Sequence, residues 1–181
     1  MTFKLTDDKL KKLNETIYSK NHLTKEKPWK EAEPTLQEWR KASPQTKGKL
    51  GVELARLACE NKGFSFKTEN NQGDCYIDEV LVEVKTAFVS YATEKQIRDN
   101  DPKVWANQIR PNQKNWDKVL LAVIHPANKA DLFMFPRHVC LSDSEFFSCG
   151  HVGTEELLQI TFNYTKDREL VERYHWQTIE L

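Results

Sequence analysis

The chain has 181 residues, of which 39% are hydrophobic and 30% charged; this composition suits one folded domain and excludes an intrinsically disordered chain. Its 27 basic and 27 acidic residues cancel, so the chain is not a generally cationic protein, and any site for a polyanion must be a local patch. No apolar run approaches the roughly 18 residues of a membrane helix, and the polar start lacks the apolar stretch of a signal peptide, so we expect a cytoplasmic protein without a membrane partner.

Helices are expected in the first third of the chain. Residues 6–19 place apolar side chains at helical spacing, and residues 34–42 form a second short helix. The best-marked helix spans residues 44–62, because Ser43 can cap it, Pro44 is tolerated in a first turn, and Gly63 can end it in a left-handed conformation.

Strand-like patterns follow the third helix. Residues 64–69, 75–78 and 80–88 are expected as consecutive strands, with a tight hairpin turn at Asp78-Glu79. Residues 92–110 are expected to be helical and to end at Pro111.

The last third mixes both kinds of element. The near-continuous apolar run at 118–124 indicates a central strand covered on both faces. After it we expect a strand, a short helix, a strand and a final helix, at residues 132–137, 138–147, 156–164 and 165–175. The order predicts one α/β domain over 1–181, with a mixed sheet of four or five strands and helices on both sides.

The strand expected at 80–88 carries an acid and a lysine. Side chains alternate along a strand, so Glu83 and Lys85 project from one face while Val82 and Val84 project from the other. The two valines are expected to face the core. The acid and the lysine then lie together where a half-buried strand meets solvent or a cleft.

A second acid is expected to join this pair. If the turn is centred on Asp78-Glu79, Asp74 on the first strand lies near the level of Glu83 on the second. Two carboxylates and one ammonium group would then converge. This combination suits phosphodiester hydrolysis, because carboxylate oxygens hold Mg²⁺, which neutralises the scissile phosphate and generates hydroxide from water, while a lysine orients the nucleophile or stabilises negative charge.

Two alternatives remain open at this point. A glutamate and a lysine two residues apart also form an ordinary cross-strand ion pair that binds nothing. Asp78 is the rival of Asp74 as first acid, because it lies five residues before Glu83. We favour Asp74 because Asp78-Glu79 makes a better turn, although a slip in register would reverse the choice.

The helix at 44–62, Asp74 and the Glu83-x-Lys85 element together resemble the PD-(D/E)xK nuclease superfamily, to which many restriction endonucleases belong. The resemblance covers roughly residues 48–137 and implies that Asp74 and Glu83 ligate metal and that Lys85 is catalytic. The family often adds a glutamate from the preceding helix, here Glu53, for which a solvated helix edge is the alternative. Gly73 stands where the family's name has proline.

The resemblance also implies a function. It predicts a restriction-endonuclease-like fold, a catalytic core of about residues 44–137, and Mg²⁺ as cofactor, with Mn²⁺ able to substitute. A small type II restriction endonuclease that cuts double-stranded DNA as a homodimer is the first choice. A strand-nicking repair nuclease or a Holliday-junction resolvase would share the core, and an RNA-cleaving relative or a non-catalytic DNA-binding module would share the fold.

Nucleic-acid contacts are expected around the site. The family places a helix between the Glu-x-Lys strand and the next core strand, which we match to residues 105–117. Its polar residues Gln108, Arg110 and Gln113, together with Lys49, are candidates to contact DNA, and a solvated helix face is the alternative.

Cysteine and histidine patterns point to no other chemistry. The four cysteines are far apart without a CxxC pair, so we expect reduced thiols and neither a disulfide framework nor a zinc site. The five histidines show no paired metal spacing.

Overall fold

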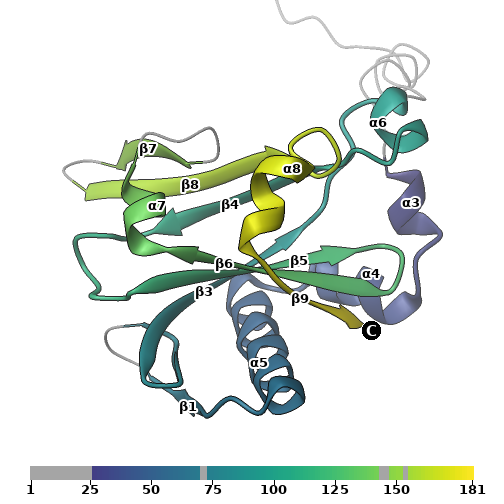
Figure 1. Cartoon of the computed structure of the whole chain (residues 1–181). Coiled ribbons are helices and arrows are strands. Elements are labelled where there is room, and N and C mark those ends of the chain that lie inside the picture. The colour runs from purple at the N-terminus through teal and green to yellow at the C-terminus, as the bar shows by residue number, and fades with distance from the viewer. Residues whose placement is uncertain (1–25, 70–72, 143–146, 153–154) are drawn as a thin grey trace, which may run out of the picture.

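The computed structural model of the chain describes residues 26–69, 73–142, 147–152 and 155–181. These form a mixed α/β structure around two sheets (Figure 1). The larger sheet has, in spatial order, β1 (Phe66–Thr68), β2 (Cys75–Ile77), β3 (Val80–Phe88), β5 (Lys118–His125), β6 (Lys129–Pro136) and β9 (His175–Glu180). The smaller sheet has β4 (Lys103–Ile109), β8 (Glu155–Asn163) and β7 (Phe147–Val152).

The described helices are mostly short: α3 (Lys27–Lys30), α4 (Pro34–Lys41), α6 (Glu94–Arg98), α7 (Arg137–Leu141), α8 (Arg168–Val171) and the 3-10 turn η1 (Glu172–Tyr174). The long exception is α5 (Pro44–Lys62), which the sequence predicted with both of its ends. Ser43 Oγ accepts a hydrogen bond from Thr46 N, and Gly63 ends the helix at a φ of 72°. The expected helix at 6–19 lies outside the described residues.

The hairpin of β2 and β3 turns where the sequence predicted. Asp78 and Glu79 have positive φ values of 45° and 68°, as a type I′ turn requires. Cys75 then pairs with Val82 and Ile77 with Val80. Asp74 directly precedes Cys75, and Glu83 directly follows Val82, at the end of this register.

The two faces of the larger sheet are covered differently. Helix α5 lies against the face that bears Val84 and Thr86, so closely that a Cβ at Gly51 would lie 2.3 Å from Thr86 Oγ1. On the other face the smaller sheet packs through aromatic rings, with Phe162 of β8 edge-on to Phe133 of β6 at 5.7 Å between centroids. Figure 1 shows α5 on one side of β3, β5 and β6 and the smaller sheet on the other.

This layering corrects the expected architecture in part. A mixed sheet with flanking helices is confirmed, and β3 pairs with β5 in parallel while its other neighbour β2 is antiparallel. The larger sheet has six strands in the described residues rather than four or five. Its second face is covered by strands where we expected helices.

The helix expected at 92–110 is the main error. Only Glu94–Arg98 is helical, and Lys103–Ile109 is strand β4, which pairs with β8. A bulge at Gln108, with a φ of 59°, shifts the register between Ala106 and Ile109. The extra residue breaks the two-residue alternation, so the strand signal was hidden.

The final helix was also predicted too long. It ends after α8 and η1, and His175–Glu180 forms β9 at the edge of the larger sheet, antiparallel to β6. The short helix expected at 138–147 ends at Leu141, and Phe147 begins strand β7. None of the described helices is long and apolar enough to cross a membrane.

Candidate active site

Backbone contacts fix Asp74 beside Glu83. Asp74 N donates to the carbonyl oxygen of Val82, the residue that also pairs with Cys75, at 2.9 Å. Its carboxylate turns back to the neighbouring strand, where Oδ2 accepts a hydrogen bond from Val84 N at 2.7 Å. The half-buried carboxylate therefore lies against the segment that carries Glu83.

Glu83 is the buried centre of the cluster. Its side chain projects from the face covered by the smaller sheet, and the residue is only 2% exposed. Lys85 Nζ lies 2.9 Å from Oε1, and Lys114 Nζ lies 2.9 Å from Oε2. A buried carboxylate is costly unless it is paired, and here two ammonium groups pair it.

The two carboxylates influence each other. Burial raises the pKa of Asp74, and the negative charge of Glu83 raises it further, while the hydrogen bond from Val84 N and the charges of Lys114 and Lys85 act in the opposite direction. Like charges held close together disfavour ionisation, and a bound cation would remove this penalty. Perturbed groups of this kind are typical of functional sites.

Lys114 belongs to a loop, residues 110–117, that is firmly attached. Arg137 Nη1 donates to the carbonyl oxygens of Lys114 and Trp116 at 3.2 and 2.8 Å, and Nη2 donates to that of Pro111 at 2.6 Å. The Arg137 guanidinium also lies 4.4 Å from the centre of the Trp116 ring. One arginine therefore holds three points of the loop.

The same loop is joined to β3. Asp117 N donates to the carbonyl oxygen of Leu81 at 2.8 Å, and Leu81 N donates back to Asp117 Oδ2 at 3.1 Å. The loop therefore keeps a fixed position relative to the strand that carries Glu83 and Lys85.

Glu53 takes a different partner. It is exposed on α5, where its oxygens accept hydrogen bonds from Arg56 Nε at 3.1 and 3.0 Å, and these bonds lower its pKa. It shares with Asp74 a surface pocket of about 420 Å³, which Lys49 and Val84 also line. No three His, Cys, Asp or Glu side chains of the described residues are grouped as ligands for one metal ion.

Asp78 lies apart from the cluster. It is exposed in the hairpin turn, where Oδ1 accepts hydrogen bonds from Ser65 N at 2.8 Å and Ser65 Oγ at 3.0 Å. This is the turn role for which the sequence favoured it.

The residues predicted to contact DNA are spread over three elements. Gln108 is exposed at the bulge of β4, and Arg110 and Gln113 are exposed in the following loop, so the expected helix is wrong for all three. Lys49 is exposed on α5 beside the pocket that Asp74 lines.

Sequence reasoning gave Lys114 no catalytic role. Nothing in its sequence neighbourhood signals that the loop folds back onto Glu83. The contacts of Arg137, 23 residues away in the chain, and those between Asp117 and Leu81 bring it there.

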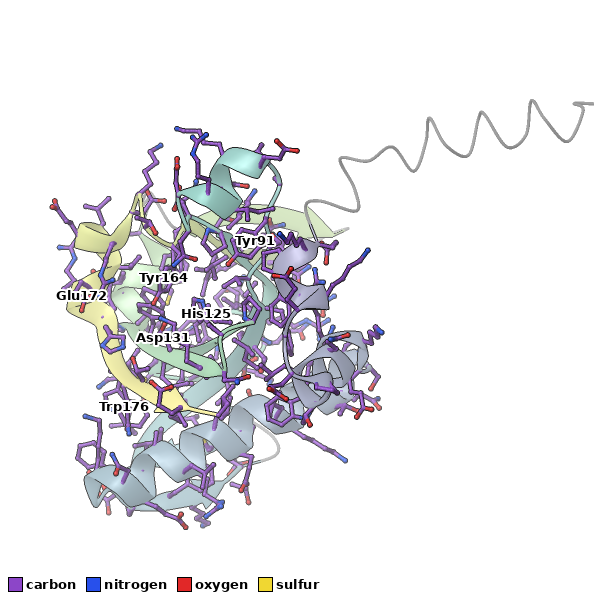
Figure 2. All side chains as sticks on the ribbon, turned by 90° about the vertical axis from the view of Figure 1, so that its right-hand side faces the viewer. Tyr91, His125, Asp131, Tyr164, Glu172 and Trp176 are labelled. Atoms are coloured by element: carbon purple, nitrogen blue, oxygen red, sulfur yellow. The ribbon has the colours of Figure 1, made fainter. Side chains whose placement is uncertain are left out.

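A second polar cluster was also missed. Asp131, on β6, is 2% exposed, and Tyr164 Oη and Thr178 Oγ1 donate hydrogen bonds to it. Nε2 of buried His125 and Nζ of Lys129 lie 3.1 and 3.4 Å from its Oδ2. Figure 2 shows Asp131, His125 and Tyr164 gathered in the interior. The available signal was an aspartate within an otherwise apolar strand.

The cysteine prediction can be compared for three residues. Cys59, Cys75 and Cys140 are free and buried. Burial raises the pKa of the Cys59 thiol to about 11, so this thiol is protonated at neutral pH.

Comparison with known proteins leaves these observations to stand alone: no family model matches the chain, and neither a curated protein nor a solved structure matches it.

Proposed function

We propose that the chain is a metal-dependent endonuclease that hydrolyses phosphodiester bonds in DNA, with a fold like that of restriction endonucleases. The observation that carries the proposal is that the Asp74 carboxylate is bonded to Val84 N, between the two residues of the Glu83–Lys85 ion pair. Glu83 and Lys85 share a strand face, and the negative charge of Glu83 raises the pKa of Asp74.

The donor set fits a hard divalent cation. Asp74 and Glu83 supply carboxylate oxygens, and Mg²⁺ is commonly held by one or two carboxylates together with water and substrate phosphate. When bound, Mg²⁺ or Mn²⁺ would neutralise charge on the scissile phosphate and acidify water at neutral pH. The repulsion between the two carboxylates supports this assignment, because a cation between them would relieve it.

Different residues would bind the metal ion, orient the attacking water and contact the DNA. Asp74 and Glu83 would hold the cation, whereas Glu53, on α5 across the sheet from Glu83, shares only the pocket that Asp74 lines. Lys85, 2.9 Å from Glu83 Oε1, would orient the attacking water and stabilise the charge that develops on the phosphate. Lys49, Gln108, Arg110 and Gln113 would supply backbone contacts to DNA.

Among nucleases of this kind, we place a type II restriction endonuclease first, acting as a homodimer so that each active site cuts one strand. A strand-nicking repair nuclease and a Holliday-junction resolvase share the chemistry and differ in substrate. Incubation with circular double-stranded, nicked and four-way-junction DNA, with and without Mg²⁺, separates the three. Sequencing of the fragment ends should find 5′-phosphates.

One observation favours a second candidate, a DNA-binding module without catalysis. Both oxygens of Glu83 already have an ammonium partner at 2.9 Å, as a purely structural ion network would. Calorimetric titration with Mn²⁺ distinguishes the candidates. A nuclease should bind Mn²⁺ through Asp74 and Glu83, whereas a chain that binds DNA and takes up no Mn²⁺ would refute the nuclease.

A further inference from the structure

Glu83 has two lysine partners, and the proposed nuclease uses only one of them. Lys85 lies two residues away on the same strand, whereas Lys114 comes from the loop 110–117 and approaches the opposite oxygen, Oε2, at 2.9 Å. This second contact is not part of the Glu-x-Lys pattern.

The fold fixes the backbone of the loop that carries Lys114. Arg137 holds the backbone at Lys114 and at Trp116, and Asp117 is bonded to Leu81. Both lysines are partly exposed, while Glu83 is almost fully covered. The ammonium group of Lys114 thus extends from a fixed loop to a buried oxygen and keeps access to solvent.

Charge balance at the cluster limits what else can bind. Asp74 and Glu83 contribute two negative charges, and Lys85 and Lys114 contribute two positive charges, so the cluster as it stands is neutral. A divalent cation entering beside Glu83 would meet two ammonium groups, and both carboxylate oxygens of Glu83 would already be engaged. A metal ion that binds Glu83 therefore competes with the two lysines for its oxygens.

Lys114 is the lysine better placed to leave. Lys85 is anchored on β3, within two residues of Glu83, and the strand direction keeps its side chain on the same face. Lys114 reaches Glu83 from across the cluster with a flexible, partly exposed side chain, so a change of rotamer can move its charge into water.

We propose that Lys114 Nζ occupies the cation position on Glu83 Oε2 in the metal-free protein and is displaced when a divalent ion binds, so that Lys114 sets the metal affinity of the site. The inference rests on the proposed function, because it assumes that Asp74 and Glu83 bind metal. Lys114 compensates the buried charge of Glu83 until metal arrives and lowers the metal affinity by the strength of that contact.

The test is calorimetric titration of the full chain with Mn²⁺, comparing the wild type with Lys114→Met and Lys114→Arg. Methionine keeps the length and loses the charge, so we expect Mn²⁺ binding to tighten by about tenfold or more, since unit charges a few ångströms apart in a partly buried site interact by more than one tenfold step. Arginine keeps the charge, so the Lys114→Arg variant should bind Mn²⁺ no more tightly than the wild type. Lys118 pairs with Val82 and lies on the opposite face of the sheet. Lys118→Met should therefore leave the Mn²⁺ affinity at the wild-type value.

The outcomes separate this inference from the nuclease proposal. Wild-type protein that binds Mn²⁺ while Lys114→Met binds it no more tightly overturns the role of Lys114 and leaves the nuclease standing. Binding only in Lys114→Met supports the inference. Absence of binding in every variant overturns both. Lys114→Gln, which keeps a hydrogen-bond donor for Glu83, takes the place of Lys114→Met if thermal unfolding shows that methionine destabilises the fold.

Discussion

Lys85 and Lys114 share the charge of Glu83, and this sharing shapes what a substitution of Lys85 should do. Lys85→Ala removes the ammonium at Oε1, but Lys114 remains 2.9 Å from Oε2, so the buried carboxylate keeps one partner. The fold should therefore survive. Cleavage of plasmid DNA with Mg²⁺ should fall by about a hundredfold or more, the typical cost of losing one charge-stabilising donor.

Two measurements accompany that assay. Thermal unfolding and DNA affinity in Ca²⁺ should stay close to those of the wild type, because Lys85 would act on the reaction rather than on packing. A Lys85→Ala variant that cuts plasmid at the wild-type rate would remove this lysine from the mechanism.

Asp74 and Asp78 allow a matched comparison at the two ends of the short strand β2. Asp74→Asn removes one negative charge beside Glu83 but can still accept the hydrogen bond from Val84 N. We expect Mn²⁺ affinity to fall by about tenfold or more, since carboxylates bind hard cations through their charge. Circular dichroism should show an unchanged fold.

Asp78→Asn is the control. Asparagine tolerates the positive φ of 45° at this turn and can still accept hydrogen bonds from Ser65. Metal affinity should therefore stay at the wild-type value. The reverse pattern, with loss of binding in Asp78→Asn alone, would transfer the first ligand from Asp74 to Asp78.

At the scale of elements, the contact between α5 and β3 holds the helix against the hairpin. Gly51 sits at the closest approach, where an added Cβ would lie 2.3 Å from Thr86 Oγ1 and 3.0 Å from Val84 Cγ1. Thr86 Oγ1 is itself engaged, because it donates to the carbonyl oxygen of Lys47 at 2.8 Å. Glycine is required here by space, since its φ is not in the left-handed region.

Gly51→Ala should therefore destabilise the protein by about 1–3 kcal/mol, the usual cost of overpacking, even though alanine favours helix. Gly48→Ala, three residues earlier on the same helix, meets nothing within 4 Å and should stabilise by about 0.5–1 kcal/mol. Urea denaturation of both variants measures the difference. Equal changes in the free energy of unfolding for the two substitutions would show that α5 does not pack tightly against β3.

The elements that sequence predicted are those with local signals. Ser43, Pro44 and Gly63 mark the ends of α5 within a few residues, and the pair Asp78-Glu79 sets the register of the hairpin. That register was enough to place Asp74 against the strand that carries Glu83. The core of the candidate site could thus be predicted because it is built from neighbouring residues.

The elements that sequence misread depend on distant partners. Strand β4 pairs with β8, some fifty residues later, and its bulge at Gln108 disguises the alternation. Strand β9 exists because β6 offers an edge, and its few residues follow directly on a 3-10 turn. Lys114 belongs to the same class, since its place beside Glu83 depends on Arg137.

At the scale of the whole molecule, Asp131 joins the last strand to the rest. Its carboxylate on β6 receives hydrogen bonds from Tyr164, directly after β8, and from Thr178 on β9, and His125 of β5 lies 3.1 Å away. Both sheets therefore meet at one buried charge. Asp131→Asn should lower the free energy of unfolding by about 3 kcal/mol or more, because removing one charge from a buried network leaves its partners unsatisfied.

The same network makes the stability of the fold depend on pH. Burial would raise the pKa of Asp131, but the contacts from His125, Thr178 and Tyr164 outweigh it and hold this pKa well below its usual value of 3.8. Burial lowers the pKa of His125 below 6.5, against the pull of Asp131. Both groups bind a proton less readily in the folded chain than in the unfolded chain, so acid favours unfolding through each of them.

The two contributions fall in different pH ranges. The stabilisation from neutral His125 is complete above pH 6.5 and is lost as the pH falls below 6.5. The stabilisation from ionised Asp131 is lost only as the pH falls below 3.8. Guanidinium unfolding at roughly pH 8, 5.5 and 3.5 should therefore give a free energy that decreases in two stages. His125→Phe should remove most of the first stage and keep the second, because Asp131 retains Tyr164 and Thr178. A decrease between pH 8 and 5.5 that is equal in wild type and His125→Phe would place the titrating group elsewhere.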